Sequence, residues 1–187
     1  RNSSWAPYSA PGHWLDGDML VIGNVGWGRK YHYTDLTPDE QYTHVTLWAM
    51  QASPLLIGCD MAVADDFTKS LLCNNEVIDV NQDPLGYAAT KIYGDNSYAT
   101  YFKPLEDGSI AVAMFNLSEK PKTIGFKPRA LGVIGDKITV RDLWRQKDIT
   151  VMTNDKDRFD TEVAPHGVVL VKVFPGFSKE RPVGSKR

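Results

Sequence analysis

The hydrophobic pattern of this chain changes once along its length, and that change limits the possible folds more than any other feature. Up to about residue 86, extended apolar runs alternate with helical patterns, whereas from about residue 90 short β runs are separated by turn residues. Alternating strands and helices are typical of parallel sheets, and evenly spaced short strands are typical of antiparallel sandwiches. The pattern therefore predicts an α/β part followed by an all-β part.

The first part has the order strand, helix, strand, helix. Thr37, Pro38 and Glu40 have the spacing of an N-cap, a first-turn proline and a capping-box glutamate, which marks the start of a helix. The continuous apolar run after Pro54 is typical of a strand that is buried on both faces. Two such units cannot cover both faces of a sheet, so we expect a portion of a larger α/β fold. The predicted elements are a strand over 14–22, a loop over 23–28, a helix over 38–52, a strand over 55–59 and a helix over 65–72.

The second part shows no helical period. Asp107 and Gly108 form a strong tight-turn signal between two β runs, as in a hairpin. The regular spacing of the runs favours an antiparallel sandwich. Residues 178–187 contain Lys, Arg, Gly and Pro without a hydrophobic pattern, and we expect this tail to be flexible. The predicted strands are 98–102, 110–115, 123–126, 138–142 and 168–174.

Composition limits the classes of partner. The 187 residues include 21 basic and 23 acidic side chains without long blocks of one sign, so we expect neither nucleic acid nor a membrane surface as a partner. No apolar run approaches the roughly 20 residues of a membrane span. The chain begins without an initiator Met or a signal-peptide pattern, and we expect it to start inside a longer protein. Cys59 and Cys73 are predicted to be buried free thiols, although a disulfide between them remains open.

Two carboxylates lie close together in the segment WLDGDM at residues 14–19. On a strand, Asp16 and Asp18 share a face, and Gly17 loosens the pleat between them. Two like charges on one face need hydrogen-bond donors or a polyhydroxyl ligand, which is the chemistry of a sugar site. The alternative is structural, with one aspartate capping a neighbouring loop or helix and the other solvated. The residue pattern alone leaves both open.

Several other side chains have a functional and a structural interpretation. Trp14 can stack on a sugar ring or pack in a core, whereas core packing is expected for Trp48 in the middle of a helix. Asp60 follows the predicted strand 55–59, where it either meets a ligand or caps the next helix. His166 is expected to be a turn histidine. The histidines have no metal-ligand spacing and the Gly-rich loop lacks the Lys of a phosphate-binding loop, so no metal or cofactor is expected.

Three segments carry specific motifs: WLDGDMLVIGN at 14–24, LWAMQASPLLIGCDM at 47–61 and EVIDVNQDPLG at 76–86. In this order and spacing they resemble glycoside hydrolase family 27, which contains α-galactosidases and α-N-acetylgalactosaminidases. Two later segments, VRDLWRQKDI and VAPHGVVLVKV, look like the C-terminal β-domain of that family.

The resemblance implies the last two β/α units of a (β/α)8 TIM barrel, followed by an antiparallel C-terminal β-sandwich. The strands at 14–22 and 55–59 would then be the seventh and eighth strands of the barrel. We accordingly expect residues 1–88 to be the C-terminal part of the catalytic barrel, residues 89–177 to be the sandwich domain, and residues 178–187 to be a tail.

The resemblance also implies a substrate site. In the family's W-N-D-P-D-M motif the second Asp and the Met line the galactose pocket, and these positions are Asp18 and Met19 here. Our predicted substrate-binding set adds Trp14 and Asp16. This chain has Leu15 and Gly17 where the motif has Asn and Pro. These two differences leave open the geometry of the loop and the identity of the sugar that it recognises.

Members of the family use a retaining mechanism. One Asp attacks the anomeric carbon and a second acts as acid and then base, with the two carboxyl groups ~5 Å apart. In the family the nucleophile lies in a K-x-D strand end and the acid/base follows an Arg, both upstream of the matched motifs. Neither pattern occurs in residues 1–13, so we expect no catalytic residue in this chain and no activity from the chain alone.

For the parent protein, the resemblance implies release of terminal α-linked galactose from galactosides or oligosaccharides. The expected partner of this chain is the remainder of the catalytic barrel, and a secreted or periplasmic location is expected. Alternative substrates are α-N-acetylgalactosaminides and β-L-arabinopyranosides. Two other classes remain open: a non-catalytic carbohydrate-binding or structural module, and a family member without activity.

Overall fold

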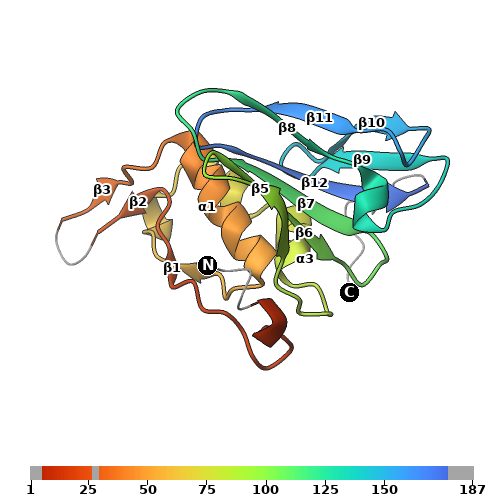
Figure 1. The fold of residues 1–187 in the computed structure, drawn as a ribbon. Coiled ribbons are helices and arrows are strands. Elements are labelled where there is room, and N and C mark those ends of the chain that lie inside the picture. Colours follow the sequence, from red (N-terminus) through yellow and green to blue (C-terminus); the bar gives the residue numbers. More distant parts are fainter. Residues whose placement is uncertain (1–5, 27–29, 177–187) are drawn as a thin grey trace.

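A six-stranded antiparallel sheet forms the centre of the molecule (Figure 1). The computed structural model describes residues 6–26 and 30–176, so the predicted tail at 178–187 and part of the predicted loop at 23–28 lie outside the described residues. In spatial order the strands of this sheet are β10 (Lys147–Met152), β9 (Ile138–Asp142), β12 (Val168–Pro175), β7 (Ile110–Asn116), β6 (Tyr98–Pro104) and β5 (Thr90–Gly94).

A second layer covers one face of this sheet. It consists of β8 (Lys122–Phe126) and β11 (Phe159–Val163), which pair with each other in antiparallel register (Figure 1). The short helix η4 (Pro128–Leu131) follows β8. The two layers share one apolar core, so they form the β-sandwich that the strand spacing predicts. That core includes Val112, Met114, Val140, Val171 and Val173 from the large sheet, and Ile124, Phe126, Phe159 and Val163 from the covering layer.

Helices cover the opposite face of the large sheet. β7 is buried along its whole length because its side chains alternate, with Ala113 in the core under the helices and Val112 in the core under β8 and β11. The longest helix, α1, packs on β12, β7 and β6, and α3 packs beside α1. Within the described ranges no helix is long and apolar enough to cross a membrane. The helices are α1 (Pro38–Gln51), α2 (Asp66–Leu72) and α3 (Asn75–Asn81).

The N-terminal part contains a small parallel pair of strands. β1 pairs with β4 in parallel, and α1 lies between them in the sequence. A hairpin of β2 and β3 follows β1 and projects from the molecule at the left of Figure 1. The predicted loop at 23–28 is therefore partly a strand. The elements are η2 (Ala6–Tyr8), β1 (Met19–Leu20), β2 (Asn24–Val25), β3 (His32–Tyr33), β4 (Leu56–Ile57) and η3 (Met61–Val63).

The first predicted strand, at 14–22, is much shorter than expected. Only Met19 and Leu20 pair with another strand. Asp18 has φ 65°, in the left-handed region, and this conformation interrupts an extended chain. The prediction that Asp16 and Asp18 project from one face of a strand is therefore wrong.

The second predicted strand, at 55–59, exists but is not buried. Leu56 and Ile57 pair with β1, yet their side chains are 47% and 48% exposed. Among the described residues β1 is the only strand paired with β4, and one neighbour cannot cover two faces. The predicted burial on both faces is wrong for the described part of the chain.

The predicted helix starts at Thr37 and Asp65 are confirmed. Thr37 Oγ1 accepts from Glu40 N at 3.3 Å, and Glu40 Oε2 accepts from Thr37 N at 2.8 Å, which completes the capping box of α1. Asp65 is the N-cap of α2. Helix α3 was not predicted, although Asn74 caps it by accepting two of its backbone N–H groups. Strands β5, β10 and β11 were also not predicted.

Both cysteines are free, as predicted, but neither is buried. Cys59 is half-buried just after β4, and Cys73 is exposed. Cys73 is the C-cap of α2 and lies at the end of that helix, where no other element covers it within the described chain. The prediction of two buried thiols is wrong.

Candidate functional site

The two aspartates of the predicted sugar site lie in an Asx turn, in which an aspartate side chain accepts from the backbone N–H two residues later. Asp16 Oδ1 accepts from Asp18 N at 2.8 Å, and Asp18 Oδ1 accepts from Met19 N at 2.8 Å. Aspartate tolerates the left-handed conformation better than most residues because its side chain bonds to the nearby backbone in this way. Both side chains are exposed. Each carboxylate therefore keeps one oxygen without a hydrogen-bond partner among the described residues, so that it can accept from a ligand hydroxyl.

Met19 lies beside the second strand of the parallel pair. It is opposite Leu56 in the register of β1 and β4, and its side chain is half-buried. A Cβ on Gly58 would lie 2.9 Å from the Cβ of Met19, so the side chain packs directly on that glycine. Met19 thus provides an apolar surface next to the carboxylate of Asp18.

Trp14 packs at a different place. Its ring is 46% exposed, and a Cβ on Gly86 would lie 3.0 Å from its Cη2 atom. Gly86 has φ 65° and leads the chain toward the large sheet. The edge of the indole at Cη2 therefore lies close to Gly86, and the residue as a whole is exposed.

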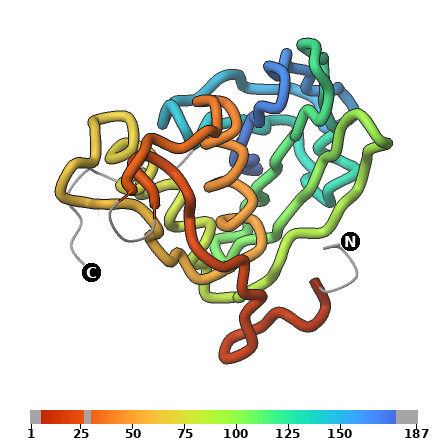
Figure 2. Tube along the Cα trace, turned by 90° about the vertical axis from the view of Figure 1, so that its left-hand side faces the viewer, coloured from red at the N-terminus to blue at the C-terminus, as the bar shows by residue number. Residues whose placement is uncertain are grey.

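Helix α1 lies beside this segment (Figure 2), and three polar side chains on one face of the helix bond to the backbone of the segment. Trp48 Nε1 donates to Asp18 O at 2.9 Å. His44 Nε2 accepts from Val21 N at 3.0 Å, and Gln41 Oε1 accepts from Gly23 N at 3.2 Å. Residues three and four apart face the same side of a helix, so the spacing of 41, 44 and 48 follows from helical geometry.

Sequence reasoning missed the role of this helix face. Trp48 does pack against the apolar core, as predicted, but its Nε1 also bonds to the Asp18 turn. Burial lowers the pKa of His44, while a hydrogen bond to the Met19 backbone works in the opposite direction. Gln41 and His44 are polar residues on a helix that packs on a sheet, and this pattern could have indicated side chains that bond to a neighbouring backbone.

The residues after β4 have structural partners. Asp60 Oδ1 accepts from Ala62 N at 2.9 Å and caps η3, as the capping interpretation of Asp60 predicts. Burial raises the pKa of the Cys59 thiol, which makes it a poor nucleophile at neutral pH. In the part of the chain that the structure describes, no three His, Cys, Asp or Glu residues gather as a metal site would require.

His166 lies in the turn before β12, with φ 53°. Its Nε2 atom is 3.0 Å from Glu119 Oε2, and this hydrogen bond raises the pKa of His166. The turn interpretation of His166 is confirmed. The predicted site residues lie on other elements.

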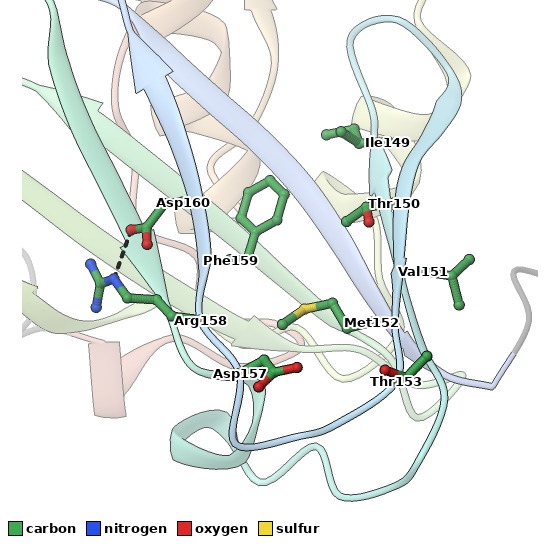
Figure 3. A pocket seen from close by; sticks show the side chains of 9 residues that line it. All are labelled: Ile149, Thr150, Val151, Met152, Thr153, Asp157, Arg158, Phe159 and Asp160. Carbon is green, nitrogen blue, oxygen red and sulfur yellow. Dashed lines mark hydrogen bonds and ion pairs between the residues drawn. The ribbon is translucent and has the colours of Figure 1, made fainter.

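The sandwich contains a separate open hollow of about 470 Å³ between β10 and the start of β11 (Figure 3). Its lining mixes apolar side chains such as Met152 and Phe159 with Asp157. Arg158 donates to Asp160 at 2.7 Å, so the guanidinium and one carboxylate of the hollow already satisfy each other. None of the predicted site residues lines this hollow.

Comparisons with known proteins agree on one family. A family model described as "Alpha galactosidase A" matches residues 1–83, and one described as "Alpha galactosidase C-terminal beta sandwich domain" matches residues 95–173. The α-galactosidase of Oryza sativa is 34% identical over 94% of this chain and 39% of its own length. The α-N-acetylgalactosaminidase of Gallus gallus is 31% identical over 90% of this chain and 40% of its own length.

Solved structures give the same result. The crystal structure of a family 27 β-L-arabinopyranosidase from Geobacillus stearothermophilus has a TM-score of 0.84 and 34% identity, covering 96% of this chain and 41% of the known one. The chain thus spans about two fifths of the length of these relatives.

Proposed function

The chain belongs to glycoside hydrolase family 27, and from this premise we propose that it is part of a retaining glycosidase that releases terminal α-linked galactose from galactosides. The observation that carries this proposal is the exposed turn at Asp18 and Met19, which occupies the place of the pocket-lining Asp and Met in the family's motif. The chain supplies one wall of the substrate pocket and the C-terminal domain.

In this proposal β1, α1, β4 and α2 are the last two β/α units of a TIM barrel whose other units complete the sheet. The parallel pairing of β1 with β4 supports it. So do the exposed apolar side chains of Leu56 and Ile57, which further barrel elements would cover. The boundary near residue 88 between barrel and sandwich is supported by the two family models, which end at residue 83 and begin at residue 95.

The pocket residues bind and orient the sugar. The free oxygen of Asp18 accepts from sugar hydroxyls, Met19 contacts the apolar part of the ring, and Asp16 and Trp14 extend the surface. Asp16 and Asp18 are not assigned as the nucleophile and the acid/base, because the family's motifs for those two residues lie upstream of the matched segments and do not occur in residues 1–13. The catalytic pair lies in the remainder of the barrel, and hydrolysis needs that part.

The test uses the complete enzyme that carries this chain. We expect the highest kcat/KM for an aryl α-D-galactopyranoside, and lower values for the α-N-acetylgalactosaminide and the β-L-arabinopyranoside. We expect Asp18→Asn to raise KM by roughly ten- to a hundredfold, because the charged acceptor of the sugar hydroxyls is lost. Asp160→Asn, which removes an exposed aspartate of the sandwich, serves as the matched control and leaves KM unchanged.

A higher kcat/KM for either of the other two glycosides would mean that the enzyme recognises that sugar instead of galactose. An unchanged KM in Asp18→Asn would remove Asp18 from the pocket. If the complete enzyme binds galactosides but hydrolyses none of the three substrates, the protein is a binding module or an inactive family member instead.

A further inference from the structure

We propose that Trp48 and His44 are positioning residues that hold the Asp18–Met19 turn in the shape that binds the sugar. The inference rests on the proposed function, because it concerns the same pocket. Neither side chain needs to touch the sugar. Both act through the backbone of the residues that do.

The turn adopts a conformation that the chain would not keep by itself. Asp18 has φ 65°, in the left-handed region that residues other than glycine adopt at a cost in free energy. The two side-chain bonds within the turn are exposed to water. Trp48 Nε1 donates to Asp18 O at 2.9 Å. This bond fixes the orientation of the peptide group between Asp18 and Met19.

Trp48 also limits where the turn can lie. A Cβ on Gly17 would be 2.7 Å from Cε2 of the indole, so the backbone of residue 17 rests directly on the ring. A side chain at this position would force the ring or the turn to shift, so Gly17 allows the turn to lie directly on Trp48.

His44 anchors the other end of the same strand. Its Nε2 atom accepts from Val21 N at 3.0 Å, which only a neutral imidazole can do. The imidazole lies against the indole of Trp48, with the ring centroids 4.1 Å apart. Trp48 thus holds the residue before β1 and His44 holds the residue after it, and the two rings support each other.

Loss of these anchors should affect sugar binding more than it affects folding. If the carbonyl of Asp18 loses its donor, the residue can relax to negative φ, and its carboxylate then moves away from the sugar hydroxyls. Displacement of a binding group by about 1 Å can cost a hundredfold in catalysis, so a tenfold loss of affinity is a moderate expectation.

The experiment compares two tryptophans of similar chemistry in the complete enzyme. Trp48→Phe removes the donor to Asp18 and keeps an aromatic ring. Trp144→Phe is the matched control, because Trp144 Nε1 donates to Thr46 Oγ1 of the same helix at 3.0 Å, away from the turn. We expect the Kd of D-galactose, measured by calorimetry, to rise about tenfold in Trp48→Phe and to stay unchanged in Trp144→Phe, with similar decreases in Tm.

His44 provides a second arm. His44→Gln keeps an acceptor for the Val21 amide, and we expect a Kd close to that of the unmodified enzyme. His44→Phe keeps a ring against Trp48 but has no acceptor, and we expect a severalfold weaker Kd. Rescue by Gln but not by Phe identifies the hydrogen bond, rather than packing, as the property that matters.

The outcomes separate the two proposals. If the unmodified enzyme binds D-galactose and Trp48→Phe binds it equally well, the positioning role is wrong and the proposed function stands. Equal loss of affinity in Trp48→Phe and Trp144→Phe would mean that only general stability changed, which also overturns the inference. An unmodified enzyme that does not bind D-galactose would overturn the proposed function and the inference together.

Discussion

Lys103 is a buried charged residue that connects the large sheet to the helices that cover it. It comes from β6 and is completely buried. Its Nζ atom donates to Val80 O at 2.5 Å and to Ala49 O at 3.4 Å. These carbonyls lie near the C-terminal ends of α3 and α1, where the helix dipole favours a positive charge. The ammonium therefore ties both helix ends to the sheet.

Burial lowers the pKa of Lys103 from 10.5 to about 8, although the nearby Asp83 opposes this shift. Between about pH 8 and 10.5 the unfolded chain therefore binds more protons than the folded one, and the free energy of unfolding rises with pH in that window. We expect Lys103→Met to abolish this part of the rise. Urea unfolding at several pH values between 7 and 10 measures it, with the exposed Lys147→Met as the control. An identical pH dependence in Lys103→Met would contradict the expectation.

At the scale of elements, a cluster of polar side chains links the β9–β10 hairpin to helix α3. Arg141 of β9 donates to Glu76 of α3 with two nitrogens, at 2.8 and 2.9 Å, and to Asp148 at 3.0 Å. These two hydrogen-bonded carboxylates raise the pKa of Arg141 further above its usual value. Gln146 of the same hairpin donates to Asn75 at 2.7 Å. These hydrogen bonds therefore attach the β9–β10 hairpin to the first turn of α3.

We expect Glu76→Ala to lower the free energy of unfolding by about 1–3 kcal/mol, because it leaves the largely buried guanidinium of Arg141 with fewer partners. The control is Lys69→Ala, which breaks an exposed ion pair with Asp66 at 3.7 Å and should change stability by less than about 0.5 kcal/mol. Urea denaturation of both variants provides the comparison. Equal effects of the two substitutions would mean that the contact between β9 and α3 contributes no more than a surface pair.

At the scale of the whole molecule, the large sheet contributes side chains to two hydrophobic cores, one on each of its faces. Helices α1 and α3 bury one face of the large sheet, and β8 and β11 bury the other. The helical side carries the Asp18 turn, and the parallel pair beside it exposes Leu56 and Ile57. The described chain thus combines a β-sandwich with a parallel strand pair that exposes apolar side chains.

We expect the 187-residue chain alone not to hydrolyse an aryl α-galactoside, because the catalytic pair is assigned to the remainder of the barrel. Release of the aryl group, followed by absorbance, is the measurement, and the complete enzyme is the positive control. Turnover by the chain alone that Asp18→Asn abolishes would place the catalytic pair inside this chain.

Local sequence signals determined the elements that depend on a few neighbouring residues. The capping box at Thr37 and Glu40 specified the start of α1, and the Asp-Gly pair at 107–108 specified a hairpin between β6 and β7. Strand 138–142 was predicted with its observed bounds. Such features follow from backbone hydrogen bonds and turn geometry within one short segment. The motifs likewise pointed to the family without any knowledge of the fold.

Only the tertiary structure decided the features that depend on distant residues. The left-handed Asp18 is held by Trp48, 30 positions away, and no local pattern shows that bond. Lys103 is buried because carbonyls at the ends of two helices receive its charge, whereas lysine side chains are mostly exposed in folded proteins. The physical reason is the same in both cases. Strain and burial of polar groups persist only where the surrounding packing provides compensating partners, and that packing exists only in the folded chain.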